Sequence, residues 1–423
     1  MNTPRVYTSR IPGAVRIGEP DRTSDRDVVV CAFARSPFGR FDGALAPLET
    51  AQLGAAVIDA LLRKADVDPA RVEALYAGVG LAGSAVLSVT RQAVLRSSLP
   101  ETTPSMGIDR ACCSGITAIA QAARDIASGL QEVAIAGGME SLSNMPLQLP
   151  RRHGVRPGQT QLVDPLILGG AVVDRPIATY SGEEAVRFGV GREEQDAWAA
   201  NSHARYFAAA EQGVFDSEIV PLDIDVQGTA RHIRQDESPR RDSTPEKLAR
   251  LKTVYGSPTI TAGNAPGLSD GAAFVLLTTR ARARAENWPV LGRIAAYAQV
   301  AGSPTSGTST PAVALRNLLQ VAGIGLEQLG RIEINEAYAA TPLVSTTVLA
   351  GGDAALLEQL RARTNPWGGA VALGHPLGAS GARLVMTLLN GFARSGAQSG
   401  PQYAVASICG GFGQGDALLV ESA

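Results

Sequence analysis

A pair of cysteines followed by small residues is the stretch of this sequence best suited to chemistry: Cys112 and Cys113 stand immediately before Ser114 and Gly115. Ser114 and Gly115 are typical of turns and helix starts, and apolar residues then recur at helical spacing as far as Ile126. Free backbone N–H groups at a helix start lower the pKa of a thiol and favour the nucleophilic thiolate. The alternative is that both cysteines are small hydrophobic residues opening a core helix. Residues elsewhere in the chain must decide between these interpretations.

A base for such a thiol is offered by His375, which lies in a Gly-rich turn before a helical pattern, whereas the other three histidines lie in polar stretches. An imidazole can take the proton of a thiol and leave a thiolate, the arrangement used in nucleophilic catalysis and acyl transfer. Cys409 offers a second proton donor and acceptor, and the backbone N–H groups of the adjacent Gly410-Gly411 turn can hold an oxyanion. Taken alone, Cys409 fits a buried thiol at a strand end equally well, and Asn335 fits an ordinary turn residue.

The segments around these residues alternate between strands and helices. Residues 28–33 and 133–136 predict buried strands, and residues 48–66 predict an amphipathic helix. Strands separated by helices indicate a layered α/β fold. From about 142 to 268 the pattern loosens into a Pro-rich and charged region that includes a polar helix at 192–212, which we interpret as an inserted, loop-rich region.

The second part of the chain repeats features of the first in the same order. The matched features are a strand after a helix, a small-residue helix start and a strand that ends in Gly-Gly. They pair 72–77 with 329–334, 113–119 with 379–385, and 133–138 with 403–411. Three matches in order predict two similar α/β halves. Packed as a pseudo-symmetric pair, the halves would bring Cys112, Asn335, His375 and Cys409 to one shared face.

The composition limits the function classes. With 423 residues, 45% hydrophobic and 18% charged, the chain is long enough for two or three globular domains. A formal net charge of −2 argues against binding to nucleic acid or an anionic membrane, and no run approaches the ~18 apolar residues of a membrane span. Four scattered cysteines suit a reducing compartment, so we expect a cytoplasmic protein. Adjacent cysteines lack the spacing of a zinc site, so we expect no metal.

Five motifs, taken together and in order, resemble those of the thiolase family, the acyl-CoA acetyltransferases. They lie at 112–115, 137–141, 335–337, 374–381 and 409–413. The resemblance runs from about residue 27 to the C-terminus and implies the thiolase fold, an α-β-α-β-α layering of two similar halves with an inserted loop domain. The implied division is an N-terminal extension at 1–26, a first half at 27–141 and 269–289, a CoA-binding loop domain at 142–268, and a second half at 290–423.

The resemblance also implies a role for each matching residue. Cys112 aligns with the family nucleophile and His375 with the histidine that activates it. Cys409 aligns with the cysteine that removes or returns the α-proton of the second substrate. Asn335 matches the residue that holds a water in one oxyanion hole, shared with His375. The backbone N–H groups of Cys112 and Gly411 match the second hole.

The activity implied by this resemblance is reversible Claisen condensation and thiolysis of 3-oxoacyl-CoA, by a ping-pong route through an acyl-cysteine. Coenzyme A is then substrate and product, with no permanently bound cofactor, and the family suggests a homodimer or homotetramer. Direction and acyl chain length remain open.

Coenzyme A contacts are implied at two places. Arg240 stands where the family has a CoA-phosphate-binding arginine, although an exposed Arg pair such as Arg240-Arg241 is also typical of a solvated face. Ala265, Pro266 and Gly267 match the segment beside the pantetheine arm, with Pro266 in place of the usual serine, which removes a hydroxyl contact. Residues 176–184 lack the His-Met-Gly signature of short-chain biosynthetic thiolases, so they give no support to a purely acetoacetyl-forming role.

Two other functions compete with this interpretation. A 3-oxoacyl-carrier-protein synthase shares the layered halves and a cysteine, but it uses histidine partners and no second cysteine, so Cys409 favours a thiolase. A thiolase-like protein that only binds lipid or CoA would not require Cys112, His375 and Cys409 together. We therefore expect a catalytic thiolase.

Overall fold

The computed structural model of the chain describes residues 11–18, 24–84, 87–149, 152–154, 156–158, 160–167, 169, 172–226, 229–395 and 402–423. Within these residues, most strands belong to one 11-stranded sheet in which two groups of strands meet edge to edge. The junction is short, because only Gly292 and Arg293 pair with Val30 and Val29 there. The molecule is therefore best viewed as two sheets, one from each half of the chain.

The first sheet comes from the first part of the chain and from the segment after residue 268. Its strands are β2 (Val28–Arg35), β3 (Gly39–Arg40), β4 (Ala74–Gly78), β5 (Ser105–Ile108), β6 (Val133–Ser141) and β9 (Ser269–Thr279). The main order is β2-β9-β6-β4-β5, and the short β3 pairs with β9. β4 is parallel to β5 and β6, whereas β9 is antiparallel to β6 and β2. The fully buried β2, β4 and β6 agree with their apolar sequences.

The second sheet repeats this arrangement. Its strands are β10 (Gly292–Ala301), β11 (Leu329–Ile334), β12 (Tyr403–Gly410) and β13 (Gln414–Glu421). Their order is β10-β13-β12-β11, with β11 parallel to β12 and β13 antiparallel to both neighbours. In each sheet the first strand of the half lies beside the last, and the last lies beside the strand that carries a Gly-Gly pair. β12 ends at its pair, whereas β6 continues past Gly137-Gly138 to Ser141. The predicted internal repeat is therefore confirmed by the topology.

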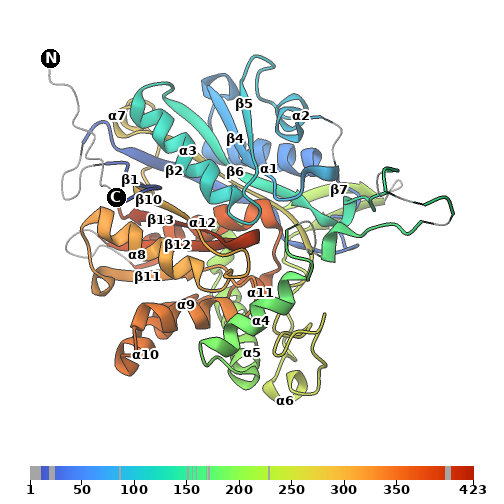
Figure 1. Cartoon of the computed structure of the whole chain (residues 1–423). Coiled ribbons are helices and arrows are strands. Elements are labelled where there is room, and N and C mark those ends of the chain that lie inside the picture. The colour runs from blue at the N-terminus through green and yellow to red at the C-terminus, as the bar shows by residue number, and fades with distance from the viewer. Residues whose placement is uncertain are drawn as a thin grey trace.

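Helices cover these sheets in layers (Figure 1). On the first half and at its junction they are α1 (Thr50–Ala65), α2 (Val89–Arg96), α3 (Ser114–Ser128) and α7 (Arg280–Ala285). On the second half they are α8 (Thr310–Ala322), α9 (Ala340–Ala350), α10 (Ala354–Arg363), α11 (Ala370–Leu373) and α12 (Leu377–Ser395). α1 packs on the outer face of the first sheet and α8 on the outer face of the second, while α12 contacts both sheets and α3. This is the α-β-α-β-α layering expected from the sequence.

The two central helices, α3 and α12, approach each other so closely that their contact requires glycine. A Cβ at Gly115 would lie 2.5 Å from the carbonyl oxygen of Gly378, and a Cβ at Gly381 would lie 2.6 Å from the backbone nitrogen of Ile116. Neither distance leaves room for a side chain. Because Cys112 precedes α3 and His375 precedes α12, this contact brings the two residues to the same end of the central layer.

The region between the halves adds α4 (Ile177–Arg187), α5 (Arg192–Glu211) and the short α6 (Pro245–Leu248), together with a two-stranded sheet of β7 (Leu222–Val226) and β8 (Thr229–Ile233). The predicted polar helix at 192–212 is α5. α4 packs against α9, and α5 packs against α11, so these helices rest on the second half (Figure 1). Leu222, Ile224 and Ile233 of β7 and β8 instead pack in the core of the first half.

The N-terminal extension contains a strand that the sequence did not predict. β1 (Ala14–Arg16) pairs antiparallel with β10, and the guanidinium of Arg16 donates to the carbonyl oxygens of Val321 and Ala322 at the end of α8. Three residues of the expected N-terminal extension thus form a strand of the main sheet, while residues 1–10 and 19–23 lie outside the described residues. In the described part of the chain, every helix is too short or too polar to cross a membrane.

Candidate active site

One cavity, of about 60 Å³, collects the chemically active residues of both halves. Cys112 reaches it from the start of α3, His375 from the turn before α12, and Cys409 and Gly411 from the end of β12. A single water needs only ~10–15 Å³ of such space, so the cavity has room for a few waters or for a small acyl group. The shared face predicted from the internal repeat is thus a depression lined by three of the four residues expected there, Cys112, His375 and Cys409, whereas Asn335 does not line it.

The two adjacent cysteines point in different directions. Cys113 is the N-cap of α3 and is fully buried, with its sulfur 3.6 Å from the carbonyl oxygen of Ile408. Cys112 lines the cavity, and the preceding Ala111 has a left-handed backbone, with φ of 51°, which turns the chain sharply at this point. Of the pair, only Cys112 is placed to meet a substrate.

The expected lowering of the thiol pKa at the helix start is not found. Burial, followed by the charges of Cys409 and Glu140, raises the pKa of Cys112 above its ordinary value. Burial also raises the pKa of Cys409 to about 12, with a further contribution from Glu184. The prediction from sequence was wrong because it considered only the effect of the helix N-terminus on the thiol pKa. Removal of water from around the thiol raises that pKa and has the larger effect. Burial therefore favours the protonated thiol form of both sulfurs.

His375 is held as a neutral imidazole in a defined tautomer. Its Nδ1 lies 2.6 Å from Ser380 Oγ, and that hydroxyl donates to the carbonyl oxygen of Pro376 at 2.9 Å. The Ser380 oxygen must then accept a hydrogen bond from the Nδ1–H group, which leaves Nε2 with a lone pair. Burial, helped by the charge of Arg383, lowers the pKa of His375 to about 3. The imidazole can therefore act as a base through Nε2 at neutral pH.

Asn335 stands directly behind this base. Its Nδ2 lies 3.4 Å from His375 Nε2, and its backbone N–H donates to the carbonyl oxygen of Ser407 on β12. The side chain is fully buried, yet its Oδ1 has no hydrogen-bond partner among the described residues. A buried hydrogen-bond acceptor without a protein partner is a typical binding site for a water molecule.

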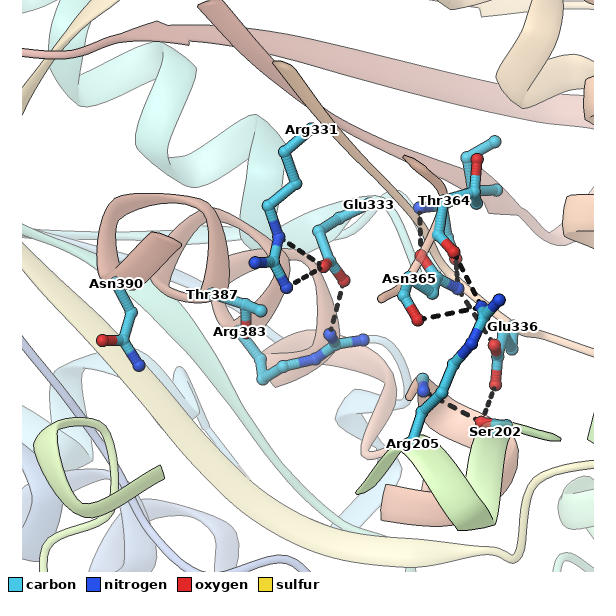
Figure 2. A network of polar contacts seen from close by, with 12 residues as sticks. Ser202, Arg205, Arg331, Glu333, Glu336, Thr364, Asn365, Arg383, Thr387 and Asn390 are labelled. Carbon is cyan, nitrogen blue, oxygen red and sulfur yellow. Dashed lines mark hydrogen bonds and ion pairs between the residues drawn. The ribbon is translucent and has the colours of Figure 1, made fainter. Parts of the chain in front are cut away.

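Glu336 anchors the Asn335 segment to the inserted region. Its buried carboxylate accepts hydrogen bonds from Trp198 Nε1 at 2.8 Å, Ser202 Oγ at 2.8 Å, Asn365 Nδ2 at 3.0 Å and the backbone N–H of Val371 at 3.0 Å. Figure 2 shows Glu336 between Ser202 of α5 and Asn365, with the separate ion pairs of Arg331 and Arg383 to Glu333 nearby. These bonds fix the backbone that carries Asn335.

The Gly410-Gly411 turn fits against the segment that carries the nucleophile. A Cβ at Gly410 would lie 2.9 Å from the carbonyl oxygen of Arg110 and 3.0 Å from the Cys113 sulfur, so a side chain has no room there. A Cβ at Gly411 would lie 3.6 Å from the Cβ of Ala111, so Gly411 adjoins the residue before Cys112. The two backbone segments expected to form one oxyanion hole are therefore neighbours.

Glu140, in the Gly-Gly motif of the first half, joins the halves at this site. Its carboxylate accepts from the backbone N–H groups of Gly80 at 2.7 Å, Leu81 at 3.3 Å and Gly378 at 2.9 Å. Burial raises the pKa of Glu140 to about 7, and these three donors oppose the rise. Gly378 lies in the first turn of α12, so the bond links the first half to the helix that follows His375.

The residues expected to bind CoA lie outside the catalytic cavity. Arg240 is exposed, and its backbone N–H donates to His203 Nδ1 at 3.1 Å. Ala265 and Pro266 are half-buried and Gly267 is exposed. The second segment connects to the site, because Ser269 Oγ accepts from the backbone N–H of His375 at 3.2 Å and donates to the carbonyl oxygen of Gly267 at 2.7 Å.

Comparison with known proteins now bears on this arrangement. The model of the thiolase N-terminal domain matches residues 28–281, and that of the thiolase C-terminal domain matches residues 288–422. The chain belongs to the thiolase family. The family resemblance of the five motifs and the expected thiolase fold are both confirmed.

Similar thiolases are known as sequences and as structures. An acetyl-CoA acetyltransferase of Pseudomonas aeruginosa is 41% identical over 401 residues, covering 93% of this chain and 99% of that protein. A beta-ketoadipyl-CoA thiolase of Acinetobacter baylyi is 39% identical, covering 92% and 97%. The crystal structure of the Bacillus anthracis acetyl-CoA acetyltransferase has a TM-score of 0.88 at 33% identity, covering 94% and 99%. Human mitochondrial 3-ketoacyl-CoA thiolase has a TM-score of 0.86 at 32% identity, covering 95% and 100%.

The thiolase cavity has further lining residues that sequence reasoning missed. They include Tyr180 of α4, Tyr338, Thr341 of α9 and Phe412. Tyr338 and Thr341 follow Asn335 at intervals of three, a spacing that places side chains on one side of a helical turn and that could have been noticed. No pattern in the sequence pointed to Tyr180, because it comes from the inserted region.

Proposed function

We propose that this thiolase is an acyl-CoA C-acyltransferase that forms and cleaves 3-oxoacyl-CoA through an acyl group on Cys112. The observation that carries the proposal is the single cavity lined by Cys112, His375 and Cys409. A carrier-protein synthase has no use for Cys409 at this place, and a protein that only binds CoA has no use for the three together. Coenzyme A serves as substrate and product, with no permanently bound cofactor.

The first half-reaction moves an acyl group from CoA to Cys112. At rest the thiol and the imidazole are both neutral, so the proton passes from the Cys112 sulfur to His375 Nε2 as the sulfur attacks the thioester carbonyl. The Cys112 S–C bond forms, the CoA S–C bond breaks, and the imidazolium returns its proton to the departing CoA sulfur. One thioester replaces another, so the exchange is close to balanced in energy.

The second half-reaction uses Cys409. In condensation the Cys409 thiol passes its proton to His375, and the Cys409 thiolate takes a proton from the α-carbon of a second acyl-CoA. The resulting carbanion attacks the acyl carbonyl on Cys112, the C–C bond forms as the Cys112 S–C bond breaks, and His375 returns its proton to the Cys112 sulfur. In thiolysis the Cys112 sulfur, with its proton on His375, bonds to C3 as the C2–C3 bond breaks, and the Cys409 thiol gives its proton to C2. Because burial favours the protonated form of Cys409, this thiol is suited to donate its proton in the thiolysis direction.

Two sets of donors meet the negative charge that develops. A water that Asn335 Oδ1 can hold, and His375 Nε2 while it carries the proton taken from Cys409 in condensation or from Cys112 in thiolysis, face the enolate oxygen. The backbone N–H groups of Cys112 and Gly411 face the tetrahedral oxyanion on the acyl carbon. Each such donor is typically worth ~3 kcal/mol of barrier in a water-excluded site.

We further propose that residues 142–268 form the CoA-binding loop domain, with Arg240 at a CoA phosphate and residues 265–267 along the pantetheine arm. Ser269 supports the placement of residues 265–267 along the pantetheine arm. Its hydroxyl donates to the carbonyl oxygen of Gly267 and accepts from the backbone N–H of His375, so it links this segment to the catalytic histidine. Removal of the Arg240 guanidinium would then weaken CoA binding without changing acyl transfer to Cys112.

A cytoplasmic homodimer or homotetramer is the assembly we propose. Edge strand β5 is not covered by another strand of the described residues, and its Met106 is 48% exposed, which supports association through this edge. The four cysteines are free, which suits a reducing compartment. Light scattering on the purified chain tests the assembly, and a monomeric mass would contradict it.

The decisive experiment is labelling with radioactive acetyl-CoA followed by peptide mapping. We expect one label, on Cys112, and we expect a Cys113→Ala variant to keep it, because the Cys113 sulfur faces the core. A label on Cys113, or no label at all, would overturn the assignment.

A further inference from the structure

Two buried hydroxyl groups in the catalytic cavity have no role in the mechanism described so far. Tyr180, from the inserted region, is 2% exposed, and Thr341, from the second half, is 0% exposed. Both residues line the cavity. Neither hydroxyl makes a well-formed hydrogen bond to another described residue, although the Thr341 hydroxyl lies beside the Cys409 thiol, a weak partner. Buried polar groups are nearly always paired, so two hydroxyls in one cavity without a strong partner call for a ligand or water.

The two hydroxyls stand where the acyl group must lie. Burial and the neighbouring Cys409 and Cys112 sulfurs raise the pKa of Tyr180 to about 12, so the phenol stays protonated and can donate. Thr341 lies close enough to Cys409 to favour its thiolate. An acyl group bonded to Cys112 and attacked from the Cys409 side occupies the space between these groups.

This part of the cavity has no positive charge. Among the described residues that line it there is no arginine or lysine, and His375 is neutral. Glu184, just behind the lining, already accepts hydrogen bonds from the backbone N–H and the hydroxyl of Thr308 and from the hydroxyl of Ser309. A second carboxylate brought by a substrate would be buried without a counter-ion.

The cavity of about 60 Å³ can hold water on both hydroxyls while an acetyl group is present. A longer alkyl chain would expel that water and leave both hydroxyls without partners. A buried polar group that loses its partner weakens binding, typically by about tenfold or more. The lining therefore selects by polarity as well as by size.

We propose that the hydroxyls of Tyr180 and Thr341 form a specificity-determining subsite that admits an acetyl-sized, uncharged acyl group and rejects longer alkyl chains and a terminal carboxylate. The proposal rests on the proposed function, since the acyl group is the one carried by Cys112. It separates this chain from relatives named for beta-ketoadipyl-CoA, whose acyl portion ends in a carboxylate.

Thiolysis rates of three CoA thioesters test the subsite: acetoacetyl-CoA, 3-oxohexanoyl-CoA and 3-oxoadipyl-CoA. We expect the wild-type protein to favour acetoacetyl-CoA in kcat/KM. In Tyr180→Phe and in Thr341→Val, the ratio of kcat/KM for 3-oxohexanoyl-CoA to kcat/KM for acetoacetyl-CoA should rise about tenfold. The alkyl chain then no longer leaves that hydroxyl without a hydrogen-bond partner. The rate with 3-oxoadipyl-CoA should stay low in both variants, because neither adds a cation.

Matched variants separate polarity from size and folding. Thr341→Ser keeps a hydroxyl and should keep the wild-type ratio. Tyr255→Phe makes the same chemical change at a tyrosine that is 57% exposed and outside the cavity lining, so its ratio should not move.

The outcomes distinguish this proposal from the proposed function. Failure of the wild-type protein to take a label from acetyl-CoA on Cys112 would refute the proposed function. Normal labelling with an unchanged ratio in both Tyr180→Phe and Thr341→Val would refute the subsite alone. Wild-type thiolysis of 3-oxoadipyl-CoA or 3-oxohexanoyl-CoA as fast as that of acetoacetyl-CoA would also refute it.

Discussion

Replacing Ser380 by alanine tests whether the tautomer of His375 matters to catalysis. Ser380 Oγ lies 2.6 Å from His375 Nδ1 and uses its own proton on the carbonyl oxygen of Pro376. Without the hydroxyl, the Nδ1–H group is buried and unpaired. The imidazole then loses the interaction that keeps its lone pair on Nε2, the nitrogen beside Asn335.

The expected size of the effect follows from that lost partner. A buried donor left without an acceptor costs about 1–3 kcal/mol. This cost destabilises the tautomer of His375 that has its lone pair on Nε2, which is the form that acts as the base. The expected drop in kcat is then roughly 5- to 150-fold, since ~1.4 kcal/mol corresponds to a factor of ten. KM should change little, because the side chain of Ser380 does not line the cavity.

Two assays locate the effect. Exchange of labelled CoA into acetyl-CoA reports the first half-reaction, and thiolysis of acetoacetyl-CoA reports both. Since His375 serves each half-reaction, Ser380→Ala should slow both by the same factor, whereas Ser128→Ala, an exposed serine at the far end of α3, should slow neither. An unchanged exchange rate in a folded Ser380→Ala protein would refute the tautomer argument.

Four further variants have defined expectations. Cys409→Ser should lose condensation yet still accept acetyl from acetyl-CoA on Cys112, and a loss of labelling would contradict the division of roles. Glu336→Gln puts an amide NH2 against donors that now face a carboxylate, so the free energy of unfolding in urea should fall by about 3 kcal/mol; an unchanged value would show that the network is dispensable. Burial, followed by the Arg240 charge, lowers the pKa of His203 to about 4. Between about pH 4 and the ordinary pKa of histidine, the unfolded chain therefore binds more protons at this residue than the folded chain does. The free energy of unfolding consequently falls as the pH drops through this window. Relative to His203→Gln, the wild-type protein should lose about 2 kcal/mol between about pH 7.5 and about pH 5, and parallel urea curves would refute this. Arg240→Ala should raise KM for CoA several-fold with kcat unchanged, and an unaltered KM would remove Arg240 from the CoA site.

The repeat and the convergence of reactive residues could be predicted because they depend on local patterns. Continuous apolar runs predicted the strands of both halves, and apolar residues at helical spacing predicted the helices between them. The Gly-Gly pairs at 137–138 and 410–411 mark equivalent positions of β6 and β12, and this equivalence predicts that Cys112 and Cys409 share a common face.

Other features depend on burial and long-range contact, which a local pattern does not contain. The helix start at Ser114 predicted a lowered pKa for Cys112, but the loss of water around the sulfur has the larger effect. β1 forms in the extension because the edge of β10 is open to it, and a three-residue strand has no periodicity to detect. Tyr180 reaches the cavity only because α4 packs beside α9.

The glycine contact between α3 and α12 has a consequence for the origin of the molecule. One half carries the nucleophile, and the other carries the imidazole and the second sulfur. These groups come together as one catalytic centre only because the halves meet where Gly115 contacts Gly378. An ancestor consisting of one such half would have had to meet a copy of itself to assemble any comparable centre. Fusion of two such copies into one polypeptide would free each copy to lose what the other supplies, and this chain has a cysteine before one central helix and a histidine before its twin.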